Sequence, residues 1–310
     1  MKIVLSLNNQ TRLYDYIDMG IDTFVLGGKY SFHCPCVFDI EEMKKMKERY
    51  PNIHFYVAVN ALYDQHMIAD LQVYLNQLYQ INIDGLLFQD FGVLQIVKEN
   101  GYHFDMMYSP ETLNTNACTL QVLQQQGVNS AFLSRVIPLQ EQLEIRHLVD
   151  MPLMLQVHGV EYIAASKREL LSNYKQASHL EFDLQDQKSL MLKAKNSTYE
   201  LRIFEDHFGT HIFSNERLYM LDLLNQIHEF DNLYIETLMM DDEEAIEIAS
   251  LYSDALKSYE NQTYDRDVKE YMNLMYRLKT PLGRGFLFDQ TVYKLEDMRK
   301  MDNEKRESNH

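Results

Sequence analysis

The chain has 310 residues, of which 46% are hydrophobic, and its 46 acidic and 29 basic residues give a formal net charge of −17. This balance argues against tight autonomous binding to a nucleic-acid backbone, which needs clustered Lys and Arg, but leaves room for a local basic patch or a basic partner. Three cysteines exclude a disulfide framework and a four-thiolate metal or iron–sulfur site within one chain.

No apolar run is long enough to cross a membrane, and the N-terminus enters a predicted strand directly, without a signal-peptide pattern. A solvated acidic surface and few cysteines are ordinary for a protein of the reducing cytoplasm. We therefore expect a cytoplasmic protein with no membrane association.

Eight short apolar runs, each about the length of a buried strand, recur along the chain. Their near-continuous hydrophobicity is typical of strands covered on both faces, and helical stretches separate most of them. Eight strands alternating with helices predict a closed (β/α)8 barrel of the TIM type. The runs cover residues 3–7, 23–28, 54–60, 85–90, 104–109, 130–135, 153–159 and 233–236.

Helical periodicity fills the connections between the first seven runs. Asp39 is expected to cap the helix that follows the second run. After the fifth run, Ser109 or Thr112 can cap a helix that Gly127 ends. The other helices are expected over residues 8–20, 65–80, 91–99 and 138–148.

The alternation breaks between the seventh and eighth runs, where about 70 residues separate Gly159 from Leu233. Residues 175–214 alternate like antiparallel strands joined by turns, so we expect a β-rich insertion over the mouth of the barrel. A helix over 215–230 is expected to lead into the eighth strand.

A helix over 241–260 is expected to close the barrel, so that the barrel domain with its insertion spans residues 1–260. Residues 261–310 then form a C-terminal extension, helical at first, with a Gly-rich turn over 280–288 and a frayed polar tail.

Functional groups of such a barrel gather at the carboxyl ends of its strands, so the polar residues that end each run are the candidates. Arg135 can bind a carboxylate or phosphate by a two-pronged contact. His158 can exchange protons near neutral pH, and Glu236 can act as a base or as the partner of Arg135. We predict His158 and Glu236 as catalytic residues, and Arg135, Asn60, Glu111, Asn116 and Asp90 as ligand-binding residues.

Each of these residues also has an ordinary structural role open to it. Asn60 and Asp90 can cap helices, Arg135 can form a buried ion pair, and His158 can be a satisfied core histidine. The sequence has no Gly-x-Ser-x-Gly elbow, HExxH zinc helix, phosphate loop or dinucleotide fingerprint. From the residues alone the reaction stays open, and we predict no metal site.

Several segments, in the right order over almost the whole chain, resemble the peptidase U32 family, also called the collagenase-like proteases. They are GIDTFVLGG, YSPETLNTN, AFLSRVIPLQE, VHG, LLSNY, EDHFGTHIFSNERL, YIE and TPLGRGFLF. The resemblance implies a barrel with an appended β-rich region. It also implies a role like that of known members, which act in hydroxylation of the tRNA wobble uridine, of rRNA cytidine or of the ubiquinone ring. Those members carry an iron–sulfur cluster on four cysteines, and the tRNA enzymes draw on prephenate.

The chain departs from the family pattern where the cluster ligands are expected. The segment HGVEYIAASKRELLSNY has Glu161 and Ser166 near positions where the resemblance places sulfur, and no cysteine follows Cys118. The family's Ile-Glu-Gly-Arg ending is shortened to Ile-Glu-Thr, which keeps Glu236 and loses the Gly-Arg pair. The chain therefore resembles a short, cysteine-poor branch that binds no cofactor of its own.

The resemblance implies a cluster-less subunit of a prephenate-dependent complex that 5-hydroxylates the tRNA wobble uridine. A cysteine-bearing U32 paralogue would carry the iron–sulfur cluster, and tRNA would be contacted through the complex. Two alternatives stay open. One is a collagenase-like peptidase that uses His158 and Glu236; the other is a non-catalytic barrel that binds a small carboxylate such as prephenate through Arg135.

Overall fold

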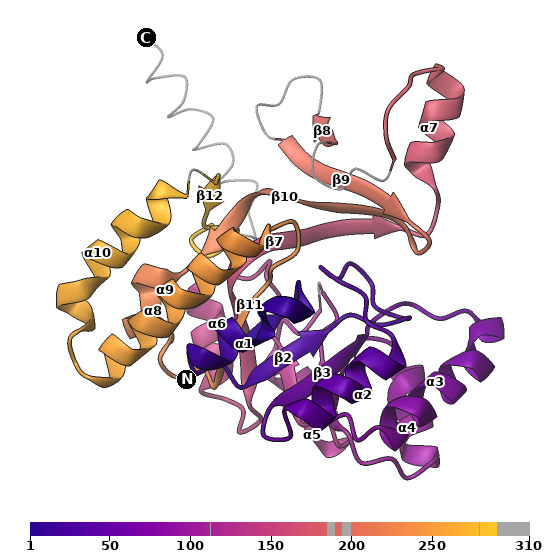
Figure 1. Cartoon of the computed structure of the whole chain (residues 1–310), viewed down its shortest axis with the longest axis horizontal. Coiled ribbons are helices and arrows are strands. Elements are labelled where there is room, and N and C mark those ends of the chain that lie inside the picture. The colour runs from indigo at the N-terminus through magenta and orange to yellow at the C-terminus, as the bar shows by residue number, and fades with distance from the viewer. Residues whose placement is uncertain (112, 185–189, 194–199, 279, 290–310) are drawn as a thin grey trace.

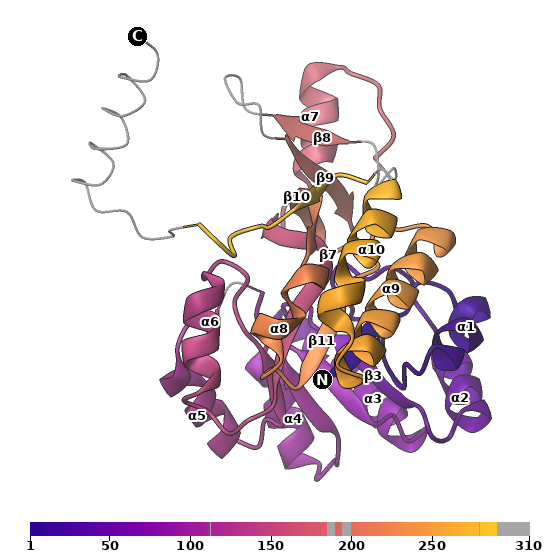
Figure 2. The same ribbon diagram turned by 90° about the vertical axis from the view of Figure 1, so that its left-hand side faces the viewer.

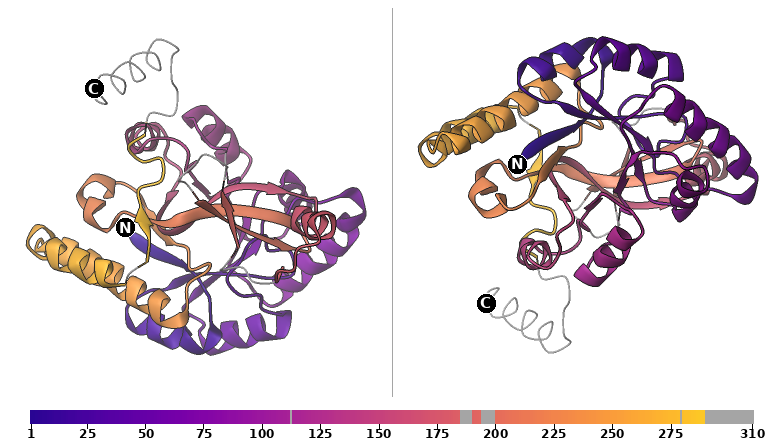
Figure 3. Two further views of the ribbon diagram at one scale, coloured as in Figure 1. Left: turned by 90° about the horizontal axis from the view of Figure 1, so that it is seen from above. Right: turned by 90° about the horizontal axis from the view of Figure 1, so that it is seen from below.

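The computed structural model describes residues 1–111, 113–184, 190–193, 200–278 and 280–289. At its centre is a closed barrel of parallel strands, in which each strand pairs with the next and β11 pairs with both β7 and β1 (Figure 1, Figure 3). The predicted (β/α)8 barrel is therefore confirmed. In the described residues its strands are β1 (Lys2–Ser6), β2 (Thr23–Leu26), β3 (His54–Val59), β4 (Gly85–Phe88), β5 (Asp105–Tyr108), β6 (Ser130–Phe132), β7 (Leu153–Ser166) and β11 (Asn232–Ile235).

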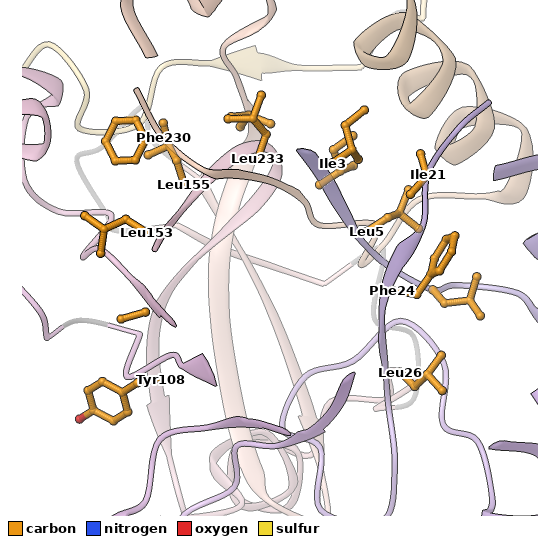
Figure 4. Close-up of a cluster of buried hydrophobic side chains, with 14 of the residues drawn as sticks. Ile3, Leu5, Ile21, Phe24, Leu26, Tyr108, Leu153, Leu155, Phe230 and Leu233 are labelled. Atoms are coloured by element: carbon orange, nitrogen blue, oxygen red, sulfur yellow. The ribbon is translucent and has the colours of Figure 1, made fainter. Parts of the chain in front are cut away.

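Side chains of the barrel strands alternate between its inside and its outside, because successive residues of a strand point to opposite faces. The outward residues, such as Leu5, Phe24 and Leu155, belong to the large core that packs under the helices (Figure 4). Burial on both faces explains why the strands read as continuous apolar runs. The interior is filled by one residue from each strand: Val4, Val25, Ala58, Leu87, Met107, Phe132, Met154 and Tyr234.

Helices lie around the outside of the barrel in the connections between strands (Figure 2). Asp39 caps the second helix through a capping box with Glu42, as the sequence predicts. The helices of the barrel connections are α1 (Leu13–Asp18), α2 (Ile40–Arg49), α3 (Ile68–Gln80), α4 (Phe91–Glu99), α5 (Ala117–Gln125) and α6 (Leu139–Arg146), with short 3-10 turns η1 (Gln10–Arg12) and η2 (Gln65–Met67).

The helix after β5 begins later than the sequence predicts. Its N-cap is Asn116, whose side chain accepts a hydrogen bond from the backbone N–H three residues on, at 2.9 Å. Ser109 therefore does not cap it, and Thr112 lies outside the described residues. The reason is local: Glu111 and Asn114 have φ values of 61° and 68°, in the left-handed region that a right-handed helix does not contain.

An antiparallel ribbon extends from the carboxyl end of the barrel and crosses over it (Figure 1, Figure 3). The sequence predicts that β7 ends at Gly159, but the strand continues to Ser166 and forms the first strand of this ribbon. The predicted antiparallel pairing is confirmed, although residues 185–189 and 194–199 of the expected insertion lie outside the described residues. The other ribbon elements are α7 (Leu170–Ser178), β8 (Met191–Lys193), β9 (Glu200–Asp206) and β10 (Gly209–Tyr219).

The helix predicted over 215–230 is wrong in its first part. β10 continues to Tyr219, because Arg217 and Leu218 pair with β7 on one side and with β12 (Leu282–Gly283) on the other. Two neighbouring strands satisfy the backbone groups here, so sheet pairing overrides the helical spacing of the side chains. Helical structure follows only as η3 (Leu221–Leu223) and α8 (Leu224–Ile227).

After β11 the chain forms α9 (Asp242–Glu260) and α10 (Tyr264–Arg277), and then a strap over residues 280–289. Arg284 holds the strap: it pairs with Asp222 at 2.6 Å, and its guanidinium lies 3.7 Å from the ring centroid of Tyr219. The predicted frayed tail, residues 290–310, lies outside the described residues. None of the helices described has the length and apolar content needed to cross a membrane.

Candidate functional site

A small cavity lies at the carboxyl ends of the barrel strands, beside the loop that follows β2. Its volume is about 30 Å³, room for one or two water-sized groups. Residues at the ends of β1 to β6 and β11 line it, together with residues 32–35 of that loop. Its polar lining side chains are Ser6, His33, Cys34, Asn60, Ser109, Glu111, Arg135, Tyr234 and Glu236.

Glu111 and Arg135, two of the predicted ligand-binding residues, form a largely buried ion pair in the cavity wall. His33 Nε2 lies 3.1 Å from Glu111 Oε1, and Arg135 Nε donates to Gln156 Oε1 at 2.6 Å. Burial alone would raise the pKa of Glu111, but Arg135 and then His33 outweigh it and lower that pKa to about 2. Glu111 is therefore ionised at neutral pH, and the guanidinium of Arg135 already has an anionic partner within the chain.

Glu236 lines the same cavity, and three donors hold its carboxylate. Ser6 Oγ and Leu238 N donate to Oε1 at 2.7 Å and 2.9 Å, and the Tyr234 hydroxyl donates to Oε2 at 3.1 Å. These bonds fix the orientation of the carboxylate, since a satisfied buried network is rigid. The cavity thus offers preorganised polar groups of both charges.

His158, the predicted proton-transfer residue, does not line this cavity. Its ring is fully buried and packs on Tyr252 of α9, with ring centroids 5.8 Å apart. The pairing of β7 with β11 explains the direction: Tyr234 is opposite Gln156 but Ile235 is opposite His158, so Val157 is an extra residue. Such a bulge shifts the alternation by one, and His158 follows Val157 onto the helix side.

Both ring nitrogens of His158 lack a hydrogen-bond partner among the described residues. Burial, followed by the charge of Arg217, lowers the pKa of His158 to about 3. The ring is therefore neutral at pH 7, and its surroundings are those of a core side chain.

Replacing His158 by Leu is expected to leave the free energy of unfolding near pH 7 unchanged or to raise it by up to about 1 kcal/mol, because the substitution removes an unpaired buried polar ring. The folded pKa lies below the ordinary value of 6.5, so the unfolded chain binds a proton that the folded chain does not. Wild-type stability should then fall as the pH drops from 6.5 towards 3, by up to about 1.4 kcal/mol per pH unit from this residue. In His158→Leu this contribution to the pH dependence of the free energy of unfolding should be absent.

Urea unfolding of both proteins at several pH values between 6.5 and 3 measures the difference at neutral pH and the dependence on pH. An unchanged pH dependence in His158→Leu would contradict the prediction.

The side chains of the remaining predicted residues form hydrogen bonds with backbone N–H groups. Asn60 lines the cavity, but its Oδ1 accepts from Phe32 N at 3.0 Å and so holds the loop after β2. Asp90 caps α4 by accepting from Gly92 N at 2.8 Å, and Asn116 caps α5. Neither Asp90 nor Asn116 is among the residues that line the cavity.

Ser6, Tyr234 and His33 of the cavity wall, and Gln156 behind Arg135, were not predicted as site residues from the sequence. Ser6 and Tyr234 could have been found, because each has the strand spacing that directs its side chain inward beside Glu236. His33 and Gln156 had no such signal. His33 lies in an irregular loop with φ 45°, and Gln156 acts through Arg135.

The cysteines of this chain do not fit the four-thiolate cluster that the family resemblance implies. Cys34 and Cys36 lie in the loop after β2, whereas Cys118 is an exposed residue of α5. Burial, then the charge of Glu236, raises the pKa of the Cys34 thiol to about 12, which disfavours the thiolate that metals bind. In the described residues no group of three or more His, Cys, Asp or Glu side chains could hold a metal ion.

Comparison with known proteins gives a family match over most of the chain. The family model described as peptidase family U32 matches residues 8–297. The tRNA hydroxylation protein P2 of Bacillus subtilis is 27% identical over 290 residues, which covers 89% of this chain and 94% of that protein.

Shorter matches link the chain to two further proteins. The tRNA hydroxylation protein P of Haemophilus influenzae is 32% identical over 121 residues, or 39% of this chain and 26% of that protein. Its Escherichia coli namesake matches equally, over 27% of its own length, so the chain spans about a quarter of each. Among solved structures, that of the U32 peptidase Mk0906 aligns at 12% identity with a TM-score of 0.46, over 76% of this chain and 92% of that one.

Proposed function

This chain belongs to peptidase family U32, and from that membership we propose that it is a subunit of a cytoplasmic complex that hydroxylates tRNA. The family resemblance noted in the sequence is confirmed. The observation that carries the proposal is the alignment with tRNA hydroxylation protein P2, because it covers nearly the full length of both proteins. The shorter matches to two tRNA hydroxylation proteins P support the same process.

We propose a division of labour within this complex. The reaction at the wobble uridine needs redox chemistry, and the three cysteines of this chain cannot hold a four-thiolate cluster. A cysteine-bearing U32 paralogue would carry that cluster, while this chain contributes a rigid barrel, a polar cavity and the ribbon above it. The net charge of −17 supports an RNA surface shared between the subunits, to which this chain by itself binds only weakly.

Binding of a small carboxylate, such as prephenate, is a further proposal, and it would require a rearrangement of the cavity. A cavity of about 30 Å³ holds one or two waters, not an organic acid. Arg135 is also neutralised by Glu111. A carboxylate would therefore have to replace Glu111 beside Arg135. The peptidase alternative is not part of the proposal, because His158, one of the two residues it would use, packs on Tyr252 and does not line the cavity.

Deleting the gene is expected to abolish the 5-hydroxyuridine-type modification of tRNA, because the complex would lack one of its subunits. Mass analysis of nucleosides from purified tRNA measures the loss. Re-expression of the wild-type chain should restore the modification, and a tagged chain should co-purify a cysteine-bearing U32 paralogue. Unchanged modification in the deletion strain would refute the proposed function.

A further inference from the structure

A second hollow lies between the ribbon and the rim of the barrel, next to the central cavity. It has a volume of about 120 Å³, the scale of a cavity that accepts one small aromatic ring. Phe32 belongs to the walls of both hollows, so a molecule in the second one would lie directly beside the barrel mouth. We refer to it as the ribbon groove; its walls are Phe32, Leu62, Gln89, Tyr162, Ala165, Ser166, Lys167 and Phe208.

Aromatic side chains from three separate parts of the chain face this groove. Phe32 comes from the loop after β2, Tyr162 from β7 and Phe208 from the turn between β9 and β10. The ring centroid of Phe32 lies 5.8 Å from that of Tyr162 and 6.5 Å from that of Phe208. Tyr162 stacks on His33 on one side, but Tyr162 and Phe208 are only partly buried, so part of each ring stays exposed at the groove.

The polar lining of the groove suits a flat heterocycle attached to a phosphate. The Gln89 amide nitrogen donates to the carbonyl of Asn60, which leaves its Oε1 as the end that can accept from a ring N–H. Lys167 pairs with Asp64 at 2.8 Å, but both side chains are about half exposed, so this pair is weak. Its ammonium can therefore exchange to a phosphate.

The charge of the chain is also least unfavourable to RNA binding along the ribbon. The described residues between 160 and 219, which form the ribbon, contain six Lys and Arg against eight Asp and Glu, whereas the other described residues contain 15 against 32. A polyanion therefore meets a near-neutral surface along the ribbon and a strongly acidic one elsewhere.

We propose that the ribbon groove binds one unstacked nucleobase of single-stranded RNA. Aromatic faces, an amide and an ammonium are the groups with which proteins hold splayed-out bases. The inference rests on the proposed function in naming RNA, and it goes further by assigning the base to a particular set of residues in this chain.

The chain contains no tryptophan, so a single introduced indole reports on the groove without background. In Phe208→Trp, titration with a uridine hexanucleotide should quench the fluorescence as a base stacks on the indole. The matched control is Tyr14→Trp, on the outer side of α1, where the replaced side chain is 62% exposed. An abasic hexanucleotide should leave both variants unquenched.

Loss of the ring should weaken binding of the uridine hexanucleotide about tenfold, as stacking contributions predict, in Phe208→Ala and also in Phe208→Leu. Leucine keeps the apolar volume and removes the aromatic face. Phe208→Leu therefore distinguishes two occupants of the groove: a stacked nucleobase, whose binding it would weaken, and an apolar protein side chain, which it would still bind. Tyr14→Ala should bind like the wild type in fluorescence anisotropy with labelled RNA.

Absence of quenching in Phe208→Trp, or equal affinity of wild type, Phe208→Ala and Phe208→Leu, would overturn the inference. If tRNA hydroxylation still depends on the gene, the proposed function survives that failure. Conversely, quenching at the groove together with unchanged tRNA in the deletion strain would refute the complex and leave the groove assignment standing.

Discussion

Gly159→Ala is expected to lower the free energy of unfolding by about 4 kcal/mol. Gly159 has φ +110°, where a side chain is strained, and an added Cβ would lie 2.1 Å from the carbonyl oxygen of Glu236. Backbone strain of about 1–3 kcal/mol and overpacking of about 1–3 kcal/mol combine here. The contact occurs where β7 meets β11 to close the barrel, so neither backbone can move away freely.

Gly20→Ala is the matched control for this substitution. Gly20 has φ +95°, similar to Gly159, but an added Cβ would meet nothing within 4 Å. It should cost only the strain, about 1–3 kcal/mol. Chemical denaturation of the two variants gives the difference, which isolates the contact with Glu236. Equal losses in both variants would show that barrel closure does not require the close approach at Gly159.

Arg135→Met is expected to destabilise the chain by about 3–5 kcal/mol, because it leaves the buried carboxylate of Glu111 without its main counter-charge. His33 stays within 3.1 Å of Glu111 and keeps part of the compensation. Adding Glu111→Gln should restore most of the stability, since a neutral pair is cheaper to bury than one lone charge. Urea unfolding of both single variants and the double variant measures this coupling, and additive losses would argue against it.

The pH dependence of these variants has a definite sign. In the wild type the pKa of Glu111 is lowered from 4.5 to about 2, so its stabilising contribution is complete above 4.5 and is lost as the pH falls towards 2. In Arg135→Met the charge and hydrogen bond of Arg135 no longer offset burial, which is the largest single influence, so that pKa should rise. The penalty of this variant should therefore shrink as the solution is acidified from neutral pH. A penalty that grows on acidification would contradict this assignment of the ion pair.

The sequence predicted the strands well because a strand buried on both faces must be apolar throughout. The runs at 23–28 and 85–90 contain β2 and β4, and Gly27 and Leu87 of these runs line the cavity at the barrel mouth. The same reasoning brought Arg135 and Glu236 to one cavity, since the ends of parallel strands meet on one face of the barrel.

The sequence was less informative where pairing between distant segments decides the outcome. β7 was expected to end at Gly159, yet it continues because β10, far along the chain, supplies the hydrogen-bonding partner. Whether His158 points into the mouth depends on the bulge at Val157, which exists only against β11. No local pattern of apolar and polar residues records such a bulge.

The order of apolar runs and of the family motifs by itself indicated a barrel of the U32 family, and the count of three cysteines is too low for a four-thiolate cluster within one chain. Those properties depend on periodicity, composition and motif order, which are local or additive. Only the tertiary structure decided that Arg135 is bound by Glu111, that His158 faces α9, and that aromatic residues from three segments enclose the ribbon groove. Each of these depends on contacts between residues far apart in the chain, whose geometry is set when the barrel closes and the ribbon folds over it.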